Sequence, residues 1–239
     1  MVLRVNCLIG GHIDDKKIYI FNCDGTFDAY QIFKLYATIK KITGIECNKY
    51  SLLFKDESGK LRSRTGSVKN METNIRRYLL SCSKFEFSAV EMNDKPQDAH
   101  YLDTEKRQHD FVIDQRKTHF SIYIVLPHSL NEAKVIDAWN QISAQYSTNY
   151  MVHYDFDVKK SPELCMYGRP FVQGLESPEE YYTESEYKIV HRLHDLQIYE
   201  TYKLDDVFPI CIATKNVSVA EQSYKSKINI GSDAYLFSK

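Results

Sequence analysis

Three side chains that can bind a divalent metal ion occur at every second position near the middle of the chain. They are His153, Asp155 and Asp157, in the segment MVHYDFDV. In an extended strand, residues two apart share one face and lie roughly 7 Å from each other. With His119 on an adjacent strand, imidazole and carboxylate ligands would converge in a set that suits such an ion. The alternative is that these polar side chains form the solvent-facing side of a half-buried strand.

A second pattern with chemical meaning is His119, Phe120 and Ser121, followed by apolar residues and a helix signal. It resembles one half of the signature of the 2H phosphoesterase family, in which two HxS or HxT motifs on paired strands act on a phosphodiester. The resemblance implies that His119 serves as an acid or base and that Ser121 binds phosphate. One histidine cannot take and give a proton at once, so a second motif is required. The corresponding segment of the first half, KIYIFNC at residues 17–23, contains no histidine.

No cofactor is expected from the sequence. Neither GxGxxG nor GxxxxGK[ST] is present, so no phosphate-binding loop is predicted, and HExxH and GxSxG are also missing. The six cysteines lie singly along the chain without a CxxC pair, which favours free thiols in a reducing compartment.

The segment around residues 161–186 has the composition of a protein-binding surface. Tyrosine, methionine and arginine are enriched at the centres of interfaces, and a loop stiffened by prolines is a common place for recognition. The candidate partner-binding residues are Tyr167, Arg169, Phe171, Glu176, Glu179, Glu180, Tyr181, Tyr182 and Glu184. The aromatic residues and Arg169 would be anchors, and the glutamates an electronegative rim. The alternative is an ordinary solvated helix start, where acidic residues meet the helix dipole favourably.

A basic run lies in the later part of the first half. It consists of Lys60, Arg62, Arg64 and Lys69, with Arg76 and Arg77 on the helix that follows. The residues 61–64 at its start predict a short edge strand. The run could meet phosphates, which keeps a nucleic-acid-binding regulatory protein as an alternative, but it contains few aromatics and also suits a solvated face.

Composition places the chain among ordinary globular proteins. Its 239 residues include 43% hydrophobic and 26% charged residues, and the net charge of -1 gives no global field for nucleic acid or an anionic membrane. No apolar run reaches the 18 residues that a membrane span needs, and the apolar N-terminus is too short for a signal peptide. We therefore expect a cytoplasmic protein, monomeric or homodimeric, without a membrane partner.

The elements that position these residues follow from hydrophobic periodicity. Residues 118–126 alternate as a strand, with Phe120, Ile122, Ile124 and Leu126 on one face. Ser129 and Glu132 then form the pattern of a capping box for a helix from residue 130 to about 146. The predicted buried stripe of this helix is Ala133, Ile136, Trp139 or Asn140, and Ile142 to Ser143. Strict alternation resumes at residues 150–158.

The first half has a similar order of elements. Strands are predicted at residues 2–9, 17–23, 48–55 and 85–92, and helices at residues 27–43 and from residue 68 onward; Gly44 is placed to end the first helix in the left-handed conformation. Residues 1–93 and 117–239 are thus predicted to be α+β halves joined by a polar linker at residues 94–116. Each half would be a small mixed or antiparallel sheet with helices packed on one face, which suggests an internal duplication.

In this general build, and in its 18 tyrosines, the chain resembles the immunity proteins that bacteria pair with polymorphic or contact-dependent toxins. The resemblance implies a stoichiometric inhibitor that is not an enzyme and that docks on a cognate toxin domain through a pre-formed surface. The rival from another class is a 2H-type phosphodiesterase or a metal-dependent hydrolase centred on His119 and His153.

Overall fold

The computed structural model describes residues 16–44, 46–79, 85–92, 107–115, 119–126, 128–156, 203–204, 208–231 and 233–239. Its α-helices are α1 (Gln31–Thr43), α2 (Met71–Tyr78) and α3 (Glu132–Ser143), and its 3-10 turns are η1 (Val68–Asn70) and η3 (Glu221–Ser223). The strands are β1 (Lys16–Asp24), β2 (Lys49–Lys55), β3 (Leu61–Ser67), β4 (Phe85–Met92), β5 (Arg107–Gln115), β6 (His119–Leu126), β7 (Thr148–Phe156), β8 (Lys203–Leu204), β9 (Ile210–Thr214), β10 (Ser218–Val219), β11 (Ser226–Gly231) and β12 (Ala234–Ser238). The strand predicted at residues 2–9 lies outside the described residues.

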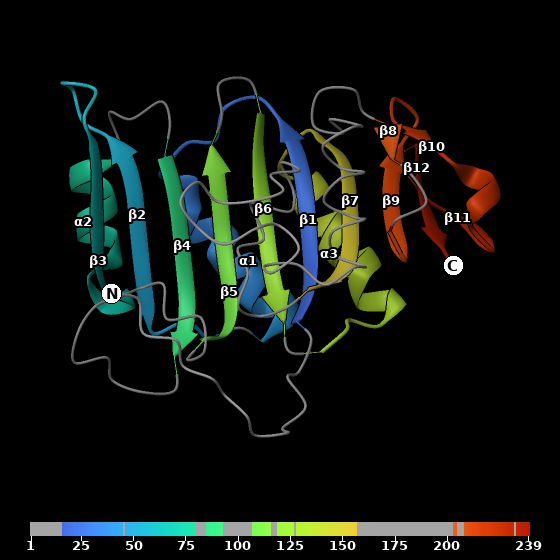
Figure 1. The fold of residues 1–239 in the computed structure, drawn as a ribbon, viewed down its shortest axis with the longest axis horizontal. Coiled ribbons are helices and arrows are strands. Elements are labelled where there is room, and N and C mark those ends of the chain that lie inside the picture. Colours follow the sequence, from blue (N-terminus) through green and yellow to red (C-terminus); the bar gives the residue numbers. More distant parts are fainter. Residues whose placement is uncertain are drawn as a thin grey trace, which may run out of the picture.

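Ten of these strands form one sheet, in the order β11-β12-β9-β7-β1-β6-β5-β4-β2-β3 (Figure 1). Every neighbouring pair described in this sheet is antiparallel. The short strands β8 and β10 pair in parallel as a second, two-stranded sheet. Helices and strands together confirm the α+β class.

The strand order differs from the prediction of one sheet in each half. β1, from the predicted first half, lies between β6 and β7 and pairs with both, so strands of the two halves share one sheet. Residues 107–115, which were predicted to belong to a linker, form β5 and join β4 to β6. The reason is that strand pairing is non-local: an apolar strand pairs with whichever strand buries it best, and sequence order does not state the partner. The internal duplication stays a prediction.

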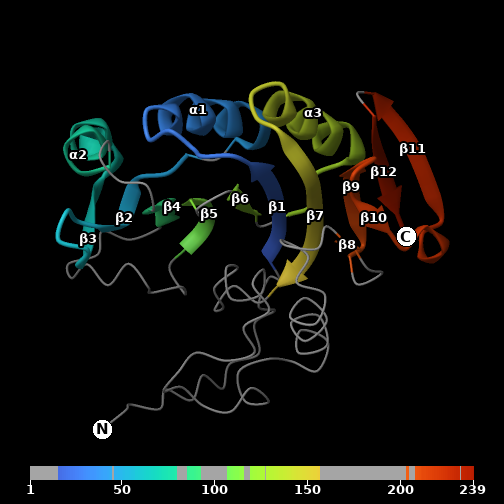
Figure 2. The same ribbon diagram turned by 90° about the horizontal axis from the view of Figure 1, so that it is seen from above.

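The helices cover one face of the sheet, as predicted, and the larger core lies beneath them. Figure 2 shows α1, α2 and α3 side by side on this face. Ile32, Leu35 and Ile39 of α1 are completely buried there against apolar strand residues, and burial of such a side chain stabilises the fold by about 1.5–3 kcal/mol. Gly44 ends α1 with φ 77°, which confirms the predicted left-handed cap. The helix begins at Gln31 rather than at residue 27, because Asp28 accepts a hydrogen bond from the backbone of Tyr30 in a preceding turn.

The start of α3 differs from the predicted capping box. Asn131, not Ser129, is the N-cap, and its side chain accepts a hydrogen bond of 2.9 Å from the Lys134 amide. The neighbouring Leu130 amide donates a hydrogen bond of 2.7 Å to the Tyr19 hydroxyl oxygen. The buried stripe also differs from the predicted one: it consists of Val135, Ala138, Trp139 and Ile142, while Ala133 is exposed.

The second face of the sheet is also buried at its centre. Its core contains Ile18 and Ile20 of β1, Tyr123 and Val125 of β6, and Tyr150 and Val152 of β7, together with Phe208 and residues of β9 and β12. Residues of β6 alternate between the two cores as predicted. The polar positions on this face are therefore not the solvent-facing side that alternation alone would suggest.

Candidate functional site

The residues predicted to bind a partner lie outside the described part of the chain. These are Tyr167, Arg169, Phe171, Glu176, Glu179, Glu180, Tyr181, Tyr182 and Glu184, and they stay a prediction. Asp157 of the alternative metal set is outside as well, whereas Asp155 occupies a position of β7 opposite Lys17 of β1. The two histidines of that set are described in full.

His119 and His153 lie on opposite faces of the sheet. His119 pairs with Asp24 and His153 with Tyr19, and these two positions of β1 alternate between its faces because they are five residues apart. The two imidazoles therefore cannot converge on one metal ion or one phosphate. Among the described residues, no group of three His, Cys, Asp or Glu side chains is placed to bind a metal.

His153 has a structural environment on the helix side. Its side chain is 5% exposed, its Nδ1 lies 3.1 Å from the Ile18 carbonyl oxygen, and its ring stacks on Tyr19 with centroids 4.4 Å apart. The Tyr19 hydroxyl oxygen in turn accepts a hydrogen bond of 2.7 Å from the Leu130 amide. The stacked rings of His153 and Tyr19 are thus part of the buried interior of the fold.

The strand opposite the HxS motif shows why a second motif is missing. The register places Asn22 opposite Ser121 and Asp24 opposite His119, so the paired strand offers an amide and a carboxylate where the family has a hydroxyl and an imidazole. Asn22 Oδ1 accepts a hydrogen bond of 3.3 Å from Asn149 Nδ2. Neither Asn22 Nδ2 nor Ser121 Oγ has a hydrogen-bond partner within the described ranges, although both residues are fully buried. Within its described residues β1 thus brings no second histidine beside His119, and two are needed for acid–base turnover.

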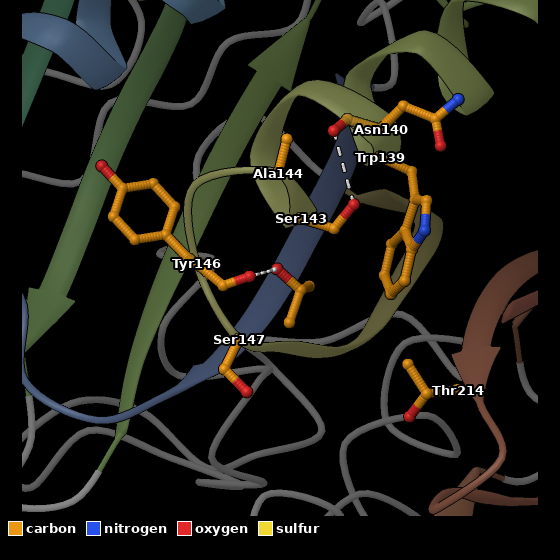
Figure 3. Close-up of a pocket in the computed structure, with 8 residues that line it drawn as sticks. Trp139, Asn140, Ser143, Ala144, Tyr146, Ser147 and Thr214 are labelled. Atoms are coloured by element: carbon orange, nitrogen blue, oxygen red, sulfur yellow. Dashed lines mark hydrogen bonds between the residues drawn. The ribbon is translucent and has the colours of Figure 1, made fainter. Parts of the chain in front are cut away.

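A cavity of about 460 Å³ lies where α3 turns into β7. Its lining consists of Trp139, Asn140, Ser143, Ala144, Tyr146, Ser147, Thr148 and Thr214, and Figure 3 shows these residues around the turn, with Thr214 contributed by β9.

The chemistry of this cavity is neutral. Thr148 donates to the Tyr146 carbonyl at 3.2 Å, and Ser143 to that of Asn140 at 3.4 Å. Burial raises the pKa of Tyr146 to about 12, and it also raises that of Cys23, which lies 3.5 Å from Thr148 Oγ1, to about 12. Neither group ionises near neutral pH, so neither provides the base or thiolate that nucleophilic catalysis requires.

The edge of the sheet formed by β3 is exposed and rich in cations. Residues 61–65 are all exposed, and Leu61 keeps 59% of its surface accessible. Between residues 49 and 79 the chain carries cations at positions 49, 55, 60, 62, 64, 69, 76 and 77 against carboxylates at 56, 57 and 72. Because the whole chain has a net charge of -1, this end is strongly basic relative to the rest. We call β3 together with Arg77 and Tyr78 of α2 the basic edge.

The side chains of the basic edge are held in place by aromatic rings and a turn. Arg64 and Arg77 lie over the Tyr78 ring, at 5.2 Å and 5.3 Å from its centroid, and Tyr78 stacks on Phe54. Arg62 Nε donates to Asp56 Oδ2 at 2.7 Å. Asp56 also accepts from Ser58 and Lys60 across the β2–β3 turn, and these hydrogen bonds, with that of Arg62, hold the pKa of its carboxyl well below the usual range.

The sequence indicated part of this site. The edge strand at residues 61–64 is confirmed, and Arg76 and Arg77 follow it on a helix as predicted. What it did not show is the ring of Tyr78, which comes to Arg64 through the packing of α2 on β2 and β3. Periodicity marks Tyr78 only as a buried helix position, so no signal in the sequence places it beside an arginine.

Comparison with known proteins gives no indication of function, so the function is argued from the structure. No protein-family model matches the chain, and no curated protein matches it either. Among the described residues, no helix has the length and apolar character to cross a membrane.

Proposed function

We propose that this chain is a non-enzymatic protein-binding module, an immunity protein that binds and inhibits a cognate bacterial toxin domain. The observation that carries the binding function is the basic edge: a seven-residue outer strand, exposed along residues 61–65, at a positively charged end of the sheet. Exposed strand edges pair readily with other chains, and soluble proteins generally cover or interrupt them. The toxin as the partner rests on the resemblance in overall build.

A protein suits the basic edge better than a nucleic acid does. Unspecific nucleic-acid binding combines free cations with aromatic faces on which bases stack. Here the Tyr78 ring already contacts Phe54, Arg64 and Arg77. In addition, Arg62 is paired with Asp56, and Arg76 donates to Glu72 at 2.7 Å. Aromatic surface and part of the positive charge are thus engaged within the protein, which disfavours the nucleic-acid alternative.

The basic edge accounts for part of an inhibitory interface. Stable complexes bury about 800 Å² on each partner, which is more than one strand edge offers. The predicted residues between Tyr167 and Glu184 are the proposed second part of the surface, and their acidic side chains would meet basic groups of the toxin. Complementary charges at two places would speed association and fix the orientation in which the toxin active site is covered.

The test uses the product of the gene beside that of this chain, which the proposal requires to contain a toxic domain. We expect coexpression to restore growth of a host that the domain alone arrests, and the purified pair to form a 1:1 complex. Arg64→Glu with Arg77→Glu should weaken the complex, and Lys34→Glu, an exposed charge change on α1, should leave it unchanged. If growth is not restored and no complex forms, the proposed function is wrong.

The enzymatic alternative is tested on the same protein. His119→Ala and Ser121→Ala remove the groups that the 2H resemblance implies, and neither lies on the basic edge. We expect both variants to protect the host as the unchanged chain does. Loss of protection in both, with thermal unfolding unchanged, would favour a phosphodiesterase over a binding protein.

A further inference from the structure

We propose that the basic edge binds an acidic, extended segment of the partner as an added strand beside β3. This inference rests on the proposed protein-binding function and deepens it, because it specifies how the partner is recognised. Three observations carry it: the direction of the backbone groups of β3, the side on which its arginines lie, and a hydrogen bond that links the two.

The backbone of β3 offers alternate residues to an incoming strand. The Asp56 amide donates to Lys60 at one end of the β2–β3 hairpin, and the Val68 amide donates to Asn48 at the other. Because hydrogen-bonded pairs alternate along an antiparallel ladder, positions 60, 62, 64, 66 and 68 direct their amides toward β2. Leu61, Ser63, Thr65 and Ser67 then direct theirs outward, where β3 has no strand neighbour within the described residues.

The side chains of β3 determine which residue types suit an added strand. Arg62 and Arg64 pair with the buried residues Phe54 and Leu52, so they share the face that α2 covers. Ser63 and Thr65 lie on the other face and are neutral. An added strand therefore fits best when acidic residues alternate with small neutral ones, since directly opposed opposite charges stabilise a strand pair. A second copy of this chain would place arginines against arginines, which disfavours pairing of β3 with itself.

One hydrogen bond links the guanidinium of Arg64 to the backbone of β3. Arg64 Nη1 donates to the Ser63 carbonyl oxygen at 2.8 Å, so the guanidinium covers an outward acceptor of the edge. A carboxylate on the incoming strand is a stronger acceptor for Arg64 than a carbonyl is. When Arg64 turns to that carboxylate, the Ser63 carbonyl becomes available to the new strand. An acidic segment thus releases the Ser63 carbonyl oxygen from Arg64, whereas a neutral segment leaves this hydrogen bond in place.

The experiment uses a labelled seven-residue peptide in which four glutamates alternate with three valines, and fluorescence anisotropy measures its affinity for the full chain. We expect N-methylation of alternate peptide amides, which removes backbone donors and keeps the charge, to weaken binding by about tenfold or more. Ser63→Pro, which removes an outward amide, should have a similar effect, whereas Ser63→Ala should not. Hydrogen exchange should slow at Leu61, Ser63 and Thr65 when the peptide is added.

The outcomes separate the strand addition from the proposed function. If N-methylation and Ser63→Pro leave peptide affinity unchanged, charge alone binds the peptide and strand addition is wrong. The same holds if a single-stranded oligonucleotide binds more tightly than the peptide, or if Ser63→Pro converts a dimer of the free chain to a monomer. If the toxin domain still forms its 1:1 complex in any of these cases, the proposed function stands without this inference.

Discussion

The two outer strands of the sheet, β3 and β11, are both exposed and both basic, yet they are built differently. Figure 1 shows them at opposite ends of the sheet. β3 pairs with β2 in an unbroken register over seven positions. β11 pairs with β12 in a register that shifts between Asn229 and Gly231, and Gly231 has φ 92°. An irregular pairing of this kind bends an edge and hinders a further strand from joining it.

The cations of the two edges also differ in the groups that they contact. Lys227 on β11 is paired with Glu221 at 2.8 Å and lies over the rings of Tyr235 and Phe237. On β3, Arg64 is held by a ring and a backbone carbonyl, and no carboxylate of the described residues is paired with it. One edge is closed by an ion pair and an irregular register, and the other keeps a straight backbone and an arginine that can exchange partners. Exposure alone therefore does not identify the edge of a sheet that binds a partner.

The largest expected effect comes from disturbing the straight register of β3. A Cβ atom at Gly66 would lie 2.9 Å from the Tyr50 hydroxyl oxygen, which Asn74 holds through a hydrogen bond. We expect Gly66→Ala to push β3 away from β2 and to lower the free energy of unfolding by about 1–3 kcal/mol. Urea unfolding measures the loss. Ser63→Ala on the same strand is the control, and equal stability of the two variants would show that β3 is more adaptable than the register suggests.

The next effect concerns peptide binding at the two edges. Arg64→Glu with Arg77→Glu should weaken binding of the acidic peptide about tenfold or more at low salt, because two cations of the basic edge become anions. The matched change at the other edge, Lys227→Glu, should leave peptide affinity within about twofold. Affinities at two salt concentrations measure the difference. Equal losses at both edges would mean that the peptide does not choose between them.

A smaller effect is expected from the closed edge. Lys227→Ala removes a cation from two aromatic rings and should lower the free energy of unfolding by about 0.5–1 kcal/mol. Lys225→Ala, an exposed neighbour without a ring contact among the described interactions, is the control for urea unfolding. If the two variants are equally stable, the rings do not contribute to closing β11.

The smallest effect is a dependence on pH at the β2–β3 turn. The pKa of Asp56 is lowered in the folded protein, so its hydrogen bonds contribute stability above the pKa of an unfolded aspartate. That contribution is lost as pH falls below about 4 toward the folded pKa. We expect Asp56→Asn to unfold at a lower temperature than the unchanged chain at pH 6, and the gap to narrow between pH 4 and pH 2. A gap that is constant with pH would show that the charge of Asp56 is not involved.

Much of the local structure could be predicted from the sequence. Alternation located β6 and β7, the left-handed glycine ended α1 at Gly44, and the run at residues 61–64 was an edge strand. The helix start at Asn131 was missed, because Ser129 offers an equally good local pattern and only the contact of Tyr19 with Leu130 decides between them. Local signals predict elements but not which of two adjacent caps is used.

The arrangement of the elements could not be predicted for a different reason. The pairing of β1 with β6 and β7 depends on contacts between residues at least 95 positions apart, such as that of Cys23 with Thr148. For the same reason the sequence grouped His119 with His153, which the sheet separates onto opposite faces. Nor does the sequence predict that Tyr78 lies beside Arg64. Chemistry assembled from distant strands becomes visible only when the strand order is known.

The central place of β1 has a consequence for how the protein is made. Both neighbours of this strand in the sheet, β6 and β7, leave the ribosome roughly 100 residues or more after it. Until then its apolar side chains and both of its backbone edges lack their final contacts, and folding dominated by such distant pairings is slow. The nascent chain therefore passes through a period of vulnerability to aggregation, and an early chaperone would have β1 as its natural target.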